Sequence, residues 1–298
     1  MSMGGYGGPS RRDVLRLGAA GLGAAAATVA GCVRRAGQTP VAVTPQPVVA
    51  PPAPFKVDIG LQSYSLRNFK SFDDVVAKMQ EAGLHYVEFF GAHFPMGMKP
   101  DELAAAQAKL AAAQIKVNAY GVVGIGKDEA GVRRMFDFAR KVGFDVYTAG
   151  PAPDAMDLLD KLVEEYKIKV AIHNHGPGDK TWGKTQQLLD GTKDHHRNVG
   201  ACLDTGHLIR SGDDPIEAVR KLGAAGRLHA FHFKDVNPQG HDVVVGRGKT
   251  DLVAFFTAVK DVGFSGPFSL EYEIDANNPM PGIAQSVAAM REAIAKVA

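Results

Sequence analysis

Apolar residues from position 55 onward follow two alternating spacings. Short runs rich in β-branched and aromatic residues, such as 168–174, have the length and composition of buried strands. Each run is followed by a longer segment with apolar residues at every third or fourth position, as in Val75, Val76 and Met79, which predicts an amphipathic helix. The predicted strands cover 56–64, 85–90, 115–120, 145–148, 168–174, 199–203, 228–233 and 267–272. The predicted helices cover 72–82, 100–113, 129–142, 156–166, 183–190, 215–222, 252–262 and 282–297.

This strict alternation of strand and helix predicts a parallel sheet covered by helices. Glycines stand where helices are expected to end, at Gly83, Gly143 and Gly263. Eight repeats of this length favour an α/β fold of the (β/α)8 TIM-barrel class, formed by one domain over residues 55–298. The first predicted strand is not followed by a glycine-rich dinucleotide fingerprint, which argues against an open dinucleotide-binding sheet.

The first 32 residues have the features of an export signal. The stretch 10–16 resembles a twin-arginine leader motif, and a short Gly/Ala-rich apolar run follows it over 17–30. The run ends in 29–32, which resembles a lipoprotein cleavage box with Cys32 as the lipidated residue; the alternative is an Ala/Gly-rich tail with an incidental cysteine. The protein is therefore expected to be exported to the periplasm, with a membrane tether if Cys32 is lipidated.

Residues 33–54 are predicted to be a linker. They contain six prolines within the fifteen residues 40–54, which impose extended backbone and remove hydrogen-bond donors.

Composition narrows the class of partner. The formal net charge of +2, with 45% hydrophobic and 22% charged residues, gives no reason to expect nucleic acid as a partner. Two cysteines, Cys32 and Cys202, exclude a disulfide framework. A homo-oligomer remains compatible with the sequence.

Four predicted strands end in side chains that can bind a metal ion or move a proton. His173, Asp204, His232 and Glu271 lie 31, 28 and 39 residues apart, and one strand with its return helix takes about 30 residues. We therefore expect all four at the carboxyl ends of successive parallel strands, where such barrels carry their chemistry. Imidazole and carboxylate ligands suit Mn²⁺, Co²⁺, Fe²⁺ or Zn²⁺ better than Ca²⁺ or Mg²⁺.

Each of these residues also has a structural interpretation. Asp204 could cap the helix that follows it. His232 lies between two phenylalanines, so it faces the barrel interior if they pack on the outer helices; alone, it would be a satisfied core histidine. Glu271 inside a barrel needs a counter-charge, for which a metal ion is the simplest candidate.

At this point the sequence resembles the xylose isomerase-like TIM barrels known as sugar phosphate isomerases/epimerases. The resemblance spans roughly residues 56–295. The stretches that carry it are 60–67, 86–88, 203–207, 232–235, 245–248 and 269–271. It implies Asp204, His232 and Glu271 as metal ligands and His207 and Lys234 as substrate contacts. In this family two glutamates usually face each other across the metal ion and shuttle a proton.

The chain departs from that pattern on the fifth strand. There His173, within a His-Asn-His triplet found in a related subgroup, replaces the expected glutamate. His173 is predicted to complete the metal shell, and His175 to bind substrate or to move a proton. Alternatively, both histidines handle protons, or one of them only hydrogen-bonds the turn at 176–178. Glu88, at the end of the second strand, is a candidate substrate contact that could instead pair with Lys56 or Arg67.

The resemblance leads us to expect a sugar isomerase or epimerase that depends on Mn²⁺, Co²⁺ or Zn²⁺. Proton transfer next to a carbonyl would pass through an enediolate that the metal ion stabilises, with Glu271, His207 and His175 as catalytic residues. The missing glutamate makes a lyase or hydratase acting on a keto-sugar such as a 3-keto-glycoside a serious alternative, and a non-catalytic sugar-binding lipoprotein is another. Export argues against a phosphorylated substrate. A nuclease of the related endonuclease type would need more histidines on the second and third strands.

Overall fold

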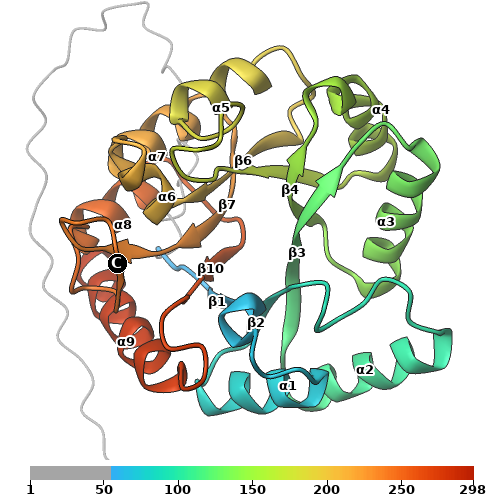
Figure 1. The fold of residues 1–298 in the computed structure, drawn as a ribbon, viewed down its shortest axis with the longest axis horizontal. Coiled ribbons are helices and arrows are strands. Elements are labelled where there is room, and N and C mark those ends of the chain that lie inside the picture. Colours follow the sequence, from blue (N-terminus) through green and yellow to red (C-terminus); the bar gives the residue numbers. More distant parts are fainter. Residues whose placement is uncertain (1–54) are drawn as a thin grey trace, which may run out of the picture. The chain divides into compact units, whose positions relative to one another are not determined.

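Eight apolar runs pair as parallel strands and close into a barrel in the computed structural model, which describes residues 55–298 (Figure 1). Around the barrel the order is β1, β10, β7, β6, β5, β4, β3, β2, and helices surround it. The barrel strands are β1 Ile59–Gln62, β2 Tyr86–Phe89, β3 Lys116–Ile125, β4 Val146–Pro151, β5 Lys169–His173, β6 Val199–Asp204, β7 Leu228–Phe233 and β10 Phe268–Leu270. The predicted (β/α)8 barrel is confirmed.

The outer helices follow the strands along the chain. They are α1 Phe72–Glu81, α2 Pro100–Ala112, α3 Glu129–Val142, α4 Met156–Tyr166, α5 Thr185–Thr192, α6 Thr205–Arg210, α7 Pro215–Ala224, α8 Leu252–Asp261 and α9 Met280–Val297. Short 3₁₀ turns lie at η1 Ser63–Leu66 and η2 Pro153–Ala155. Gly83, Gly143 and Gly263 have φ of 61°, 93° and 64° beyond the ends of α1, α3 and α8, a backbone that glycine adopts without a side-chain penalty.

The alternation of side chains along each strand decides what faces the barrel interior. On β7, Phe231 and Phe233 point outward. Their ring centroids lie 5.5 Å and 4.9 Å from the ring centroid of Phe255 on α8. His232 between them therefore points inward, as the sequence predicts.

Small side chains fill the barrel below the site. Ala119, Val146, Ala171, Cys202 and Ala230 form a buried cluster of their own. Two residues further along their strands, Ala171, Cys202 and Ala230 are followed by the polar residues His173, Asp204 and His232. The interior thus changes from apolar to polar toward the carboxyl ends of the strands.

Several features were not predicted, and three of them follow the barrel strands β1, β6 and β7. The predicted strand over 56–64 gives way to η1 after Gln62, whose side chain accepts a hydrogen bond from the Tyr64 backbone at 3.0 Å. The turn after β6 is the six-residue helix α6, which the Asp204 side chain caps. A hairpin of β8 Asp235–Val236 and β9 Asp242–Val243 follows β7.

The predicted export signal, the lipidation site Cys32 and the proline-rich linker lie outside the described residues. Within residues 55–298, no helix is both long and apolar enough to cross a membrane. Cys202 on β6 is a buried free thiol.

Replacing Phe231 tests the packing of the barrel against α8. Phe231→Ala should lower the free energy of unfolding by about 3–5 kcal/mol, because it leaves a cavity among Phe255, Phe264 and Phe268. Val253→Ala, on the exposed face of α8, should change it by less than about 0.5 kcal/mol. Urea unfolding followed by circular dichroism measures both, and equal effects would contradict this packing.

Candidate metal centre

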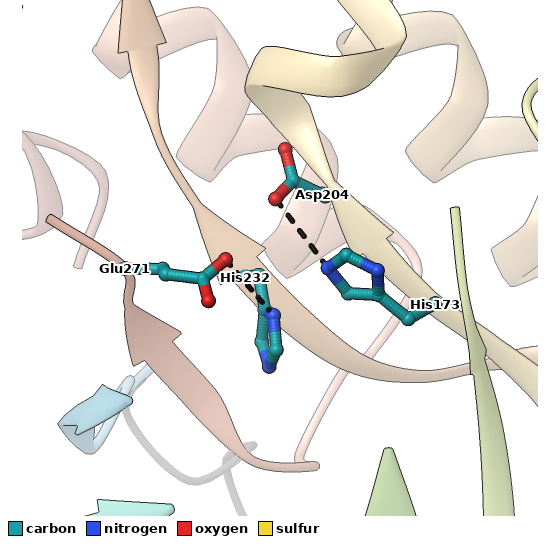
Figure 2. A group of neighbouring side chains, drawn as sticks. All are labelled: His173, Asp204, His232 and Glu271. Atoms are coloured by element: carbon teal, nitrogen blue, oxygen red, sulfur yellow. Dashed lines mark ion pairs between the residues drawn. The ribbon is translucent and has the colours of Figure 1, made fainter. Parts of the chain in front are cut away.

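The four side chains predicted to bind a metal ion meet at the carboxyl end of the barrel (Figure 2). His173 ends β5, Asp204 ends β6, His232 lies on β7 and Glu271 follows β10, and each offers a ligand atom within 4.8 Å of the others. His173 Nε2 lies 3.5 Å from Asp204 Oδ2, and His232 Nδ1 lies 3.2 Å from Glu271 Oε2. All four residues are buried.

Each of the four also carries a buried polar atom without a hydrogen-bond partner among the described residues. These atoms are both ring nitrogens of His173, Oδ2 of Asp204, Nδ1 of His232 and Oε2 of Glu271. Buried polar atoms in proteins are nearly always hydrogen-bonded, so the meeting of four such residues needs a cause. Ligands that await a cation would leave this pattern, and two imidazoles with two carboxylates suit Mn²⁺, Co²⁺ or Zn²⁺. The residues therefore fit a divalent metal ion.

Lys234 brings a positive charge to the same point. Its Nζ lies 2.9 Å from Asp204 Oδ2 and 2.8 Å from Glu271 Oε2, although not in hydrogen-bonding directions. Burial alone would raise the pKa of both carboxyl groups, but the Lys234 ammonium and the neighbouring histidines outweigh it and hold the pKa of each below its ordinary value. Burial likewise opposes the charge on Lys234, yet the carboxylates raise the pKa of Lys234 well above its ordinary value. The charges at the centre thus stabilise one another.

His173 is held in its neutral form. Burial lowers its pKa to about 4, and the nearby Asp204 offsets this only in part. A neutral imidazole is the form that binds metal ions.

A buried carboxylate fixes the orientation of His232. Its Nε2 lies 2.9 Å from Glu88 Oε1, while Glu88 also accepts hydrogen bonds from the hydroxyls of Thr148 and Ser269. Because a carboxylate accepts, Nε2 of His232 carries a proton directed at Glu88. Burial opposes a charge on the ring, but nearby groups that include Glu88 and Glu271 raise the pKa of His232 well above its ordinary value, so a metal ion would bind at Nδ1 by displacing a proton. This is the arrangement in which an outer carboxylate orients a metal-binding histidine.

Glu88 is therefore placed to position His232 rather than to touch a substrate. It is fully buried and does not line the pocket, which is at odds with its predicted role as a substrate contact. It also pairs with neither Lys56, which binds Asp58, nor Arg67, which donates to the backbone of Tyr64 and Glu273.

Side chains join neighbouring strand ends at the centre. Asn174, the middle residue of His-Asn-His, accepts from the backbone N–H of Asp204 at 2.8 Å and donates to its carbonyl at 3.0 Å. Thr205 makes the corresponding pair of bonds with the Lys234 backbone, at 2.9 Å and 2.6 Å. These bonds set the spacing of β5, β6 and β7 where the ligands project.

Asp204 combines the two roles that the sequence left open. Its Oδ1 accepts from the His207 backbone at 2.8 Å and caps α6, while its Oδ2 faces the cluster. Capping and ligation are therefore compatible here.

A pocket of about 330 Å³ opens above the cluster. It is lined by His173, His207, Lys234 and Glu271, with His175 at a more exposed position, its side chain 54% accessible. The structure thus brings the predicted His175, His207 and Lys234 to one pocket. Burial lowers the pKa of His207, and the nearby Lys234 and Arg210 act in the same direction.

Sequence reasoning missed several lining residues. These are Gln62, Tyr64, Phe90, Gly121, Val122 and Glu273. Glu273 shares the parity of Glu271, so the alternation within Glu-Tyr-Glu carried a signal for it. The others become neighbours only when β1, β2 and β3 close the barrel.

A second group of possible ligands differs from the first. Asp157, Asp160 and His195 come together on the outside of the barrel. Asp160 already accepts from His195 Nδ1 and from the His196 backbone, each at 2.8 Å. Its oxygens are thus satisfied by the protein itself, unlike those at the barrel mouth.

Fold and site together define a (β/α)8 barrel with a metal-type ligand cluster at the carboxyl ends of its strands. The chain belongs to the xylose isomerase-like TIM barrel family, whose model matches residues 76–293.

Individual relatives are more distant. An inosose dehydratase of Bacillus cereus (strain AH820) is 30% identical over 136 residues, which is 43% of this chain and 43% of that protein. The chain thus matches less than half the length of this curated relative. An uncharacterised protein of Parabacteroides distasonis is 28% identical, with a TM-score of 0.62 over 79% of this chain and 98% of its own. The IOLI protein, solved with a bound zinc atom, is 19% identical, with a TM-score of 0.67 over 81% of this chain and 99% of its own, a likeness that shows the fold.

Two neighbouring histidines give a matched test of the centre. Losing an outer-shell partner typically weakens metal binding by about 10–100-fold. His173→Ala should weaken Zn²⁺ or Co²⁺ binding by more than this, because it removes a ligand. His175→Ala should leave affinity within about threefold, since its exposed ring lies at the rim. Calorimetric titration of metal-free protein measures both, and the reverse ranking would assign the metal to His175.

Glu88 offers a test of the orientation of His232. Glu88→Gln should lower divalent metal affinity by about 10–100-fold, because the charged acceptor that orders the ring is lost. Glu217→Gln, exposed on α7, is the matched control and should bind as the parent does. Equal affinity of Glu88→Gln and the parent would show that His232 needs no such partner.

Proposed function

We propose that this protein is a divalent-metal-dependent lyase that removes water from an unphosphorylated keto-sugar or keto-polyol. The observation that carries the proposal is the composition of the pocket. Two members of the metal-type cluster, His173 and Glu271, line the pocket, and its two carboxylates, Glu271 and Glu273, both touch the ammonium of Lys234.

The ammonium that Glu271 and Glu273 share favours elimination over an epimerisation that uses two opposed carboxylates. Glu271 and Glu273 both contact the ammonium of Lys234, and we take this shared pairing as support for the view that they are not a pair of opposed proton carriers. The strand that carries the opposing glutamate in relatives carries His173 here. Elimination needs one base next to the carbonyl and one acid at the departing hydroxyl, which this pocket offers.

The residues divide these tasks by position. Glu271 is placed to take the proton from the carbon beside the carbonyl, and the breaking C–H bond supplies the electrons of the new double bond. His175, exposed at the rim with Asp179 at 3.7 Å, is placed to protonate the departing hydroxyl, which leaves as water. A divalent ion on the four ligands would polarise the carbonyl as a Lewis acid.

The charges argue for an uncharged substrate. Among the described residues that line the pocket, Lys234 is the one permanently charged cation, and Asp204, Glu271 and Glu273 already neutralise it. A phosphate group would find no unpaired cation there. Tyr64 and Phe90, which also line the pocket, pack edge to face with ring centroids 5.1 Å apart and offer an apolar surface to the C–H groups of a sugar.

The names of the matched relatives also support a lyase. Several of the matched curated proteins carry the name inosose dehydratase, which is a lyase that removes water. With the leader expected at 1–32, we further propose that the reaction takes place in the periplasm. Isomerisation or epimerisation, the first expectation from the sequence, is the alternative outcome of the experiment below.

Proton NMR in D₂O tests the reaction. Protein loaded with Mn²⁺, Co²⁺ or Zn²⁺ should exchange the C–H next to the carbonyl of an unphosphorylated keto-polyol such as an inosose, and the dehydrated product should accumulate. Phosphorylated keto-sugars should be turned over at least about 100-fold more slowly, the loss of about 2.7 kcal/mol expected when a buried site must accept an unpaired charge.

The controls separate the parts of the proposal. Metal-stripped protein and Glu271→Gln should both lose exchange. Exchange that yields only an epimer or isomer would overturn the lyase assignment. No exchange with any keto-sugar would overturn the enzymatic assignment and favour a binding protein.

A further inference from the structure

Arg210 connects the hairpin after β7 to the histidine at the pocket. At the end of α6, its Nη1 lies 3.2 Å from His207 Nδ1. Its Nε donates to the Gly240 carbonyl at 2.8 Å, and its Nη2 pairs with Asp242 of β9. Both members of the Arg210–Asp242 ion pair are largely shielded, with side chains 21% and 28% exposed. Three contacts in different directions therefore fix the guanidinium.

The contact with His207 determines where that ring carries its proton. A guanidinium has five N–H donors, accepts no hydrogen bond and stays charged at all relevant pH values. His207 Nδ1 must therefore accept, and its lone pair is occupied. The ring is then neutral, with its single proton on Nε2.

That Nε2–H has no hydrogen-bond partner among residues 55–298. The nearest carboxylate oxygen, Oδ2 of Asp204, lies 3.9 Å away, beyond hydrogen-bonding distance. His207 lines the same pocket as Lys234 and Glu271. The N–H is thus available to an oxygen atom of a ligand that enters.

We propose that Arg210 is a positioning residue that holds His207 as a fixed hydrogen-bond donor to a substrate oxygen, not as an acid or a base. With Nδ1 occupied, the ring cannot accept a proton there. Release of the Nε2 proton would leave an imidazolate anion beside Asp204, which is unfavourable. Neutral imidazoles that polarise an oxygen by donation are an established catalytic device.

The inference rests on the proposed function for the identity of that oxygen, the carbonyl or a neighbouring hydroxyl of the keto-polyol. It revises the expectation that His207 moves a proton, and it leaves proton transfer to Glu271 and His175. It also gives the β8–β9 hairpin a role, because Asp242 orients the guanidinium that selects the tautomer.

Nitrogen NMR of ¹⁵N-histidine-labelled, zinc-loaded protein tests the tautomer without any substrate. The His207 ring, assigned by its loss in His207→Gln, should show a protonated Nε2 and an unprotonated Nδ1. In Arg210→Met the ring should become a mixture of tautomers or a protonated ring. Arg220→Met, on the exposed face of α7, should leave the signals of His207 unchanged.

A protonated Nδ1 in the parent protein would overturn the inference, and so would an unchanged ring in Arg210→Met. Arg210→Lys keeps a donor and a charge and should restore part of the parent pattern, which loss of packing alone would not predict. Unfolding curves of all variants verify that they fold.

Turnover gives a second readout once the D₂O screen has found a substrate. Arg210→Met should lower kcat by up to about 100-fold with KM little changed, because the donor is misplaced at the reacting group. If the screen finds no substrate, the proposed reaction fails, while the tautomer measurement still decides the role of Arg210.

Discussion

Two buried carboxylate oxygens, Oδ2 of Asp204 and Oε2 of Glu271, set the main constraint on this molecule. Each is removed from water without a hydrogen bond from the described residues, and like charges so placed repel in a medium of low dielectric constant. The ammonium of Lys234 lies within 2.9 Å of both and offsets part of that cost. Among the described residues, the ring nitrogens of His173 and Nδ1 of His232 also have no hydrogen-bond partner, and with the two carboxylates they complete a shell that a divalent cation would satisfy.

The surrounding structure can be understood as support for this shell. Asn174 and Thr205 fasten adjacent strand ends by bonds to the backbone, so the ligands are held by strands and not by long loops. The small residues below, such as Ala171 and Ala230, leave room for the larger polar side chains above them. The barrel thus pre-organises groups that would otherwise repel one another.

The sequence was sufficient for the parts that depend on local periodicity. The alternation of Phe231, His232 and Phe233 predicts which side chain faces inward, and the spacing of about 30 residues predicts that four strand ends meet. It was insufficient where two distant segments decide the outcome. Glu88 and His232 are 144 positions apart, so neither the partner of Glu88 nor its burial follows from the residues around it. Likewise, the contact of Arg210 with Asp242 needs a hairpin that the pattern did not predict.

Two histidines of the site show how the same residue type can have two different roles. Glu88 accepts from Nε2 of His232 and so leaves Nδ1 directed toward the cluster, where a metal ion could displace its proton. In our proposal Arg210 donates to Nδ1 of His207 and so exposes the N–H of Nε2 toward the pocket. A histidine whose outer nitrogen donates to an acceptor is oriented to bind a metal ion through its other nitrogen. A histidine whose outer nitrogen accepts from a donor presents an N–H at its other nitrogen. The role of each imidazole is therefore set by the hydrogen-bond partner of its outer nitrogen. For this reason the positions of the histidines in the sequence did not reveal their roles.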